Sequence, residues 1–170
     1  MNALVVYESM WGNTEAVAGA VAEGLGAAVA LRAVTDAPRR VPDDVDLLVV
    51  GGPTHAFSMS RPATREDAVE QGARPGRAAR GIREWLDALP ASDHLDVATF
   101  DTRVTKVRRL PGSAARKAAR EIRSHHLGHV VDTQSFYVED VAGPLLDGEL
   151  ERARDWGRHL AAGSAVVGSS

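Results

Sequence analysis

Apolar residues follow two patterns along the chain, short continuous runs and longer stretches with helical spacing. Continuous runs are typical of buried strands, and apolar residues that recur every three or four positions are typical of helices packed on one face. Glycine and proline separate the segments. We therefore predict strands at residues 4–7, 28–32, 45–50, 97–100 and 129–138, the last interrupted at 132–134, and helices at about 16–25, 78–89, 113–127 and 147–160.

This alternation of strands and helices predicts an α/β fold, a three-layer doubly wound sheet of five mainly parallel strands. Each crossover between parallel strands is right-handed and covers one face of the sheet. We expect one domain over residues 1–163 and a flexible C-terminal tail at 164–170. Ligands of such sheets bind beyond the carboxyl ends of the strands. Residues 54–77 show no clear period, and loops of that length are often functional or mobile.

The composition narrows the chemistry. The 170 residues include no cysteine, which excludes disulfides, thiolate-held zinc, iron–sulfur clusters and a cysteine nucleophile. Redox chemistry would therefore need a bound cofactor. The first residues resemble a strand and not a signal peptide, and no apolar run approaches the roughly 20 residues that span a bilayer. We expect a cytoplasmic protein without membrane insertion.

The charge is unevenly distributed. The net charge is −3, but the segment from Arg61 to Arg123 carries 14 of the 20 Lys and Arg residues against nine Asp and Glu. Few aromatic residues are present there to stack on bases, so we expect no nucleic-acid partner. A solvated helix face is the favoured interpretation, and a docking surface for a protein partner is the alternative.

The loop after the first strand is the most informative motif. Ser9, Met10, Trp11, Gly12, Asn13 and Thr14 stand between a strand and a helix. Backbone N–H groups and the helix dipole converge at such a turn and favour a phosphate. The loop contains no Lys or Arg, which suits a monophosphate held by neutral donors. The alternative is that Ser9 or Asn13 only caps the helix.

Two further loops are expected at the same edge of the sheet. Pro53, Thr54, His55, Ala56 and Phe57 follow the third strand, where the planar side chains of His55 and Phe57 could contact a flat ring. Asp101, Thr102 and Arg103 follow the fourth strand. The guanidinium of Arg103 could lie near an electron-rich ring edge, and a solvated loop arginine is the alternative.

The histidines do not predict a metal site. His125 and His129 have i, i+4 spacing with His126 beside them, but Gly128 is expected to end the helix between the two. No local carboxylate completes a ligand set. Because histidines at a helix C-terminus interact favourably with the dipole, we interpret them as structural.

The motifs resemble those of flavodoxins and flavodoxin-domain proteins from Ala3 to about Ala161. Ser9, Gly12, Asn13 and Thr14 match the family's phosphate-binding pattern, and residues 51–54 are similar to its next loop, which binds one face of the flavin. The resemblance implies flavin mononucleotide (FMN) as cofactor, bound by residues 9–14, 53–57 and 101–103. The third loop departs from the family pattern, because it lacks the tyrosine that often stacks on the flavin.

The resemblance implies a redox flavoprotein, either an electron carrier that serves a protein partner or an NAD(P)H-dependent oxidoreductase that reduces a small acceptor such as a quinone. Basic loops near the predicted site favour a reductase or an unusual partner, since electron-carrying flavodoxins are usually acidic there. The alternative function is a flavin-free binding or regulatory module that docks a protein through its Arg-rich segment. Catalytic residues and oligomeric state are not predicted.

Overall fold

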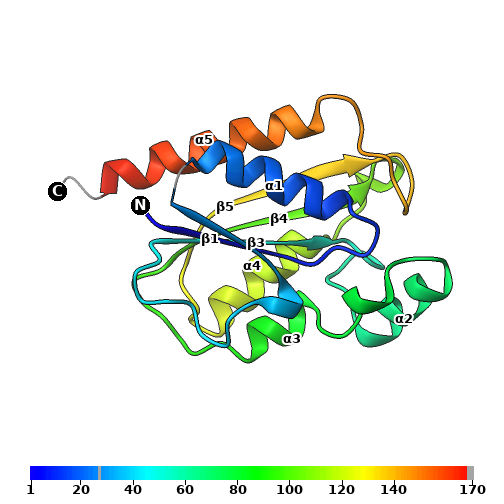
Figure 1. Ribbon diagram of the computed structural model, residues 1–170, viewed down its shortest axis with the longest axis horizontal. Helices are drawn as coiled ribbons and strands as arrows, with labels where there is room; N and C mark the ends of the chain where they lie inside the picture. Colours follow the sequence, from blue (N-terminus) through cyan, green and yellow to red (C-terminus); the bar gives the residue numbers. More distant parts are fainter. Residues whose placement is uncertain (27, 168–170) are drawn as a thin grey trace.

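The computed structural model describes residues 1–26 and 28–167 (Figure 1). Its strands are β1 (Ala3–Tyr7), β2 (Val29–Ala33), β3 (Leu47–Pro53), β4 (Asp96–Val104) and β5 (His129–Val138). Its α-helices are α1 (Asn13–Leu25), α2 (Pro62–Glu70), α3 (Ile82–Asp87), α4 (Ala114–Ser124) and α5 (Glu149–Val167). The strands form one parallel sheet in the order β2-β1-β3-β4-β5, which confirms the predicted α/β fold.

Helices cover both faces of the sheet. Helices α1 and α5 lie together on one face, and α3 and α4 lie on the other, while α2 stands beyond the carboxyl ends of the strands (Figure 1). The strand order reverses at β1, because the chain first adds β2 on one side of it and then β3 on the other. The loops after β1 and β3 therefore diverge at this edge, which is where sheets of this kind bind ligands.

Alternate residues of each strand build two apolar cores. In β1, Val5 packs with α1 and α5, whereas Leu4 and Val6 face the side of α3 and α4. Both sets are buried, which explains why the strands are continuous apolar runs. Gly51 is needed in β3, because a Cβ there would lie 2.0 Å from the ring of Phe100.

Helix α2 was missed by the sequence prediction, which expected residues 54–77 to lack regular structure. The reason is that α2 has no apolar stripe: its buried residues are Arg65 and Ala68. Arg65 is 2% exposed and donates hydrogen bonds to Ser60 Oγ (2.9 Å), the Ala78 carbonyl (3.1 Å) and Glu84 Oε1 (3.1 Å). A charged residue anchors this helix, so hydrophobic periodicity cannot reveal it.

A buried carboxylate completes the same network. Glu8, directly after β1, accepts hydrogen bonds from Ser60 Oγ and from the Ile82 N–H (2.9 Å). Burial raises the pKa of Glu8, and the hydrogen bonds from Ser60 and Ile82 oppose that rise. The network joins α2 and the start of α3 to the end of the first strand.

Several predicted boundaries were wrong. Helix α3 begins only at Ile82, because Glu84 accepts a hydrogen bond from the Gly81 N–H and closes the first turn there. Strand β4 continues to Val104, and β5 is continuous through 132–134, with a register irregularity opposite Val97 and Ala98. The last helix continues to Val167, so residues 164–167 are helical, while 168–170 of the predicted tail lie outside the described residues. Within the described chain, no helix is both long and apolar enough to cross a membrane.

Candidate functional site

A cavity of about 280 Å³ opens at the carboxyl ends of β1, β3 and β4. Three predicted loops meet there, and their lining residues are Ser9, Met10, Trp11, Asn13, Thr14, Pro53, Thr54, His55, Ala56, Thr102 and Arg103. Of the predicted site residues, Gly12, Phe57 and Asp101 do not line the cavity. The tertiary structure therefore brings together most of what the sequence predicted as one site.

The N-terminus of α1 is open toward this cavity. Ser9 Oγ accepts a hydrogen bond from the Gly12 N–H (3.1 Å), before the helix begins, and no side chain in the described residues caps α1. The interpretation of Ser9 or Asn13 as a simple helix cap was therefore wrong. Gly12 has φ +97°, a conformation that favours glycine and lets the backbone turn into the helix. First-turn N–H groups attract an anion when no side chain occupies them.

The polar side chains that begin α1 hold neighbouring segments. Thr14 Oγ1 and Thr102 Oγ1 lie 2.7 Å apart and share a buried hydrogen bond that ties α1 to β4. Asn13 Nδ2 donates to the Ala142 carbonyl (3.1 Å), beyond the end of β5. The loop is therefore held in place before any ligand binds, which lowers the conformational cost of binding.

The indole of Trp11, a residue that lines the cavity, carries a buried donor. Its Nε1 atom is buried and has no hydrogen-bond partner among the described residues. A buried N–H without an acceptor costs about 1–3 kcal/mol, so its persistence in a cavity wall favours a ligand that supplies the acceptor.

Thr54 and Asp101 form hydrogen bonds with each other and with the N-terminus of α4. Asp101 Oδ2 accepts hydrogen bonds from Thr54 Oγ1 (3.1 Å) and from the Ala115 N–H (3.0 Å), and Thr54 Oγ1 accepts from the Ala114 N–H (2.9 Å). Ser113 Oγ caps the next N–H of α4, that of Arg116, at 3.2 Å. The N-terminus of α4 is thus filled by protein groups, in contrast to that of α1. Asp101 anchors α4 and lies outside the cavity lining.

The turn after β3 presents His55 to the cavity and places Phe57 elsewhere. His55 and Ser58 exchange two backbone hydrogen bonds (2.9 and 3.0 Å), and Ala56 and Phe57 between them have φ of +46° and +62°. Phe57 is 46% exposed and its backbone packs against Gly112. Burial, with a smaller contribution from Arg65, lowers the pKa of His55 and favours its neutral form.

Arg103 is a buried cation in the cavity wall. Although predicted to follow β4, it belongs to the strand and is only 5% exposed, so the alternative of a solvated loop arginine was wrong. Its Nη2 atom donates to the carbonyls of Val107 (2.9 Å) and Leu110 (3.2 Å), whereas Nε has no partner. Within the described part of the chain no carboxylate pairs with this guanidinium, so an electron-rich ligand would stabilise it.

Comparisons with known proteins agree with this architecture. No protein-family model and no curated protein matches the sequence. Among solved structures, a flavodoxin from the domain Archaea matches with TM-score 0.61 and 19% identity over 97% of this chain and 99% of that chain. The chain has the flavodoxin-like fold.

Two further structures extend the comparison. Oxidised Flavodoxin 1 from Bacillus cereus matches with TM-score 0.64 and 14% identity, covering 95% of this chain and 98% of that one. A WrbA-like flavodoxin from Agrobacterium tumefaciens matches with TM-score 0.57 and 22% identity, covering 96% and 97%. The flavodoxin-like fold thus accounts for almost the whole chain, as the sequence motifs predicted.

The cavity also has walls that the sequence did not reveal. One is the face of α2 that carries Thr64, Asp67, Ala68 and Gln71, and the other is formed by Val104, Val138 and Val141. The α2 residues gave no signal, because the helix itself has no apolar period. Val138 could have been found, since the end of a fifth parallel strand lies at the same edge as the others.

The histidines at the end of α4 are separated in the structure. His125 is the C-cap residue of α4, whereas His129 begins β5 and its Nε2 lies 3.0 Å from the Asp93 carbonyl. Two carboxylates, Asp87 and Glu121, lie beside His125. The expectation that no local carboxylate completes a ligand set was therefore wrong, because Glu121 precedes His125 by one helical turn and Asp87 comes from α3.

Proposed function

We propose that this protein binds FMN in the cavity at the carboxyl edge of the sheet and works as a redox flavoprotein. The observation that carries the proposal is a set of donors without protein acceptors on residues that line one cavity. They are the uncapped N-terminus of α1, Nε1 of Trp11 and Nε of Arg103. FMN offers the matching acceptors, a phosphate dianion and a carbonyl-rich ring edge.

Different cavity residues would contact the phosphate and the ring of FMN. Ser9, Asn13 and Thr14, at the start of α1, would hold the phosphate, and His55 and Arg103 would contact the ring. A volume of about 280 Å³ lies just below the roughly 300–1,000 Å³ of ligand pockets. Part of the ring would therefore remain at the mouth, accessible to a redox partner.

Bound FMN would supply one- and two-electron transfer between a donor and an acceptor. The protein groups would tune that chemistry, because the buried charge of Arg103 favours electron density on a nearby ring. Two activities suit the site: electron transfer to a protein partner, and NAD(P)H-dependent reduction of a small acceptor such as a quinone. The solved structures with this fold include an oxidised and a two-electron reduced flavodoxin, which supports a redox role. The cytoplasmic location remains a prediction.

The first test is a titration of the purified chain with FMN, followed by absorbance and by quenching of flavin fluorescence. We expect perturbed flavin bands, a one-to-one endpoint and weaker binding of riboflavin, because riboflavin lacks the phosphate that α1 would bind. No binding at high FMN, or equal binding of riboflavin, would contradict the proposal. Turnover of NADH or NADPH with a quinone then separates a reductase from an electron carrier.

Two serines provide a matched pair of variants. Ser9→Ala removes a hydroxyl from the cavity wall and should weaken FMN several-fold, by about 1 kcal/mol. Ser113→Ala removes the cap of α4, which lies outside the cavity, and should leave FMN affinity unchanged while lowering stability by about 1 kcal/mol.

The second candidate is a flavin-free module that docks an acidic protein. It is favoured by the exposed side chains of Lys106, Arg108 and Arg109, none of which forms an ion pair with the described residues. Phe57 and Leu110 are also exposed. Failure of FMN to bind, together with salt-sensitive binding of an acidic partner that is lost in Arg108→Glu, would favour this function.

A further inference from the structure

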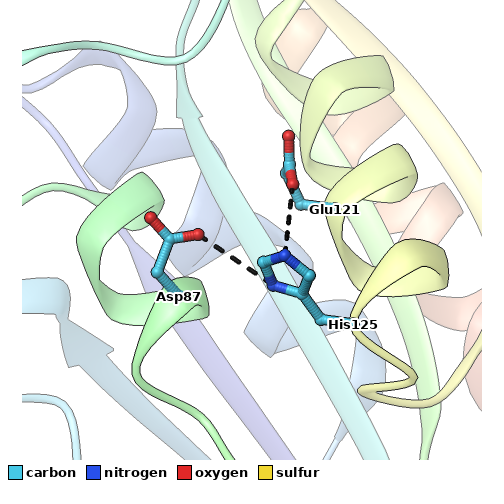
Figure 2. A group of neighbouring side chains, drawn as sticks. All are labelled: Asp87, Glu121 and His125. Atoms are coloured by element: carbon cyan, nitrogen blue, oxygen red, sulfur yellow. Dashed lines mark ion pairs between the residues drawn. The ribbon is translucent and has the colours of Figure 1, made fainter.

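A histidine and two carboxylates gather between α3 and α4. Figure 2 shows Asp87, the last residue of α3, and Glu121 of α4 on two sides of the His125 ring. Asp87 Oδ1 lies 4.0 Å from Nδ1 of His125, and Glu121 Oε2 lies 3.8 Å from Nε2. One ligand atom from each residue lies within 4.8 Å of the others. None of the three lines the cavity described above.

We propose that Asp87, Glu121 and His125 form a Zn²⁺ site that links α3 to α4. Imidazole nitrogen with carboxylate oxygens suits zinc and related transition metals, whereas calcium and magnesium prefer oxygen ligands alone. Three protein ligands leave one tetrahedral position for water. The site is independent of the proposed FMN cavity.

The geometry allows these ligands to close on one ion. Glu121 and His125 are four residues apart, so both lie on one face at the end of α4. Ligand atoms around tetrahedral zinc are roughly 3.3 Å apart, given metal–ligand bonds of about 2.0–2.1 Å. The observed separations exceed this by at most about 1.5 Å. Asp87 and His125 are both exposed, so rotation of their side chains can bring one ring nitrogen between the two carboxylates.

Lys117 is the competing cation at this site. It pairs with Oε1 of Glu121 and holds the pKa of that carboxyl below its ordinary value, while Oε2 faces His125. Glu121 therefore keeps one oxygen, Oε2, available to a metal. The charges of Lys117 and Arg83, both near Glu121, oppose cation binding. Lys117→Gln should consequently bind zinc more tightly than the native chain.

Zinc would act as a bridge between two helices. Helix α3 is short and is held at its start by Glu8 through the Ile82 N–H. An ion at Asp87 would hold its other end to α4. Because zinc would bind the folded state preferentially, saturating zinc should raise the thermal midpoint by roughly 5–10 °C.

The experiment titrates the full chain, free of any histidine tag, with ZnCl₂ and follows binding by calorimetry and the thermal midpoint. The matched variants are His125→Asn and His126→Asn. The two histidines are adjacent and exposed, and asparagine tolerates the positive φ of +54° at position 126. Asp87→Asn tests the ligand from the other helix, and CaCl₂ tests the choice of metal.

One zinc per chain, lost or weakened roughly tenfold or more in His125→Asn and Asp87→Asn but retained in His126→Asn, would support the site. A thermal shift with zinc and none with calcium, and tighter binding by Lys117→Gln, would support it further. Zinc binding that is unchanged in His125→Asn, or lost equally in His126→Asn, would overturn the proposal.

Discussion

Two arginines are buried among the residues that the structure describes, and they differ in what surrounds the guanidinium. Arg65, the anchor of α2, is 2% exposed, pairs with Glu84 and donates to Ser60, beside the buried Glu8. Arg103, near the end of β4, is 5% exposed and donates hydrogen bonds to two carbonyls, and its Nε has no partner among the described residues.

The difference separates a structural charge from one available to a ligand. A buried cation that is fully paired stabilises the packing around it, and its removal leaves its partners uncompensated. A buried cation without a counter-ion is destabilising in the absence of a ligand. The polar network beneath α2 therefore holds the fold, whereas we expect the wall that contains Arg103 to bind an electron-rich molecule. The same substitution should therefore lower stability at Arg65 and ligand affinity at Arg103.

Arg65→Leu should have the largest effect. It leaves the carboxylates of Glu8 and Glu84 without their cation, and we expect a loss of about 3–5 kcal/mol in the free energy of unfolding. Chemical denaturation of the ligand-free protein measures it. A loss below about 1 kcal/mol would show that α2 does not depend on this network.

Arg103→Leu should affect binding more than stability. The substitution removes a charge that has no counter-ion in the described residues, and we expect FMN affinity to fall about tenfold or more. Arg103→Lys keeps the charge and should retain part of the affinity. Fluorescence titration and denaturation of the same samples test this contrast. If the Leu variant instead unfolded as readily as Arg65→Leu with unchanged FMN affinity, the distinction between the two arginines would be wrong.

Trp11→Phe should have a smaller effect of the same kind. It removes the unpaired Nε1–H while keeping an aromatic ring, so FMN affinity should fall roughly two- to tenfold. The ligand-free protein should be as stable as the native chain or slightly more so, because a buried donor without an acceptor disappears. The same titration measures the affinity, and a large loss of stability would show that Trp11 is structural.

Glu8→Gln should change the pH dependence of stability. Burial raises the pKa of Glu8 in the folded state. At pH values between the ordinary pKa of about 4.3 and the raised pKa, Glu8 is protonated in the folded chain and ionised in the unfolded chain. The contribution of Glu8 to stability is therefore present at low pH and is lost as pH rises through this window. Glutamine does not ionise, so the variant should gain stability relative to the native chain with rising pH. A difference that is constant between pH 4 and 8 would contradict this.

The sequence by itself determined the sheet, the alternation of layers and most of the cavity. Strands buried on both faces must be apolar throughout, and helices that cover them need apolar residues every three or four positions, so these elements leave a local signal. The loop of residues 9–14 was recognisable because it stands between a strand and a helix; its binding of a phosphate stays a prediction.

Only the tertiary structure decided the remaining features. Helix α2 depends on Arg65, whose partners Ser60, Ala78 and Glu84 come from three other places in the chain, so no local period reveals it. Asp101 serves α4, and Arg103 is buried instead of solvated, because β4 continues past Phe100. Asp87, at the end of α3, lies beside His125, at the end of α4. Such polar contacts join residues distant in sequence, and their energy depends on burial and partners that only the folded chain brings together.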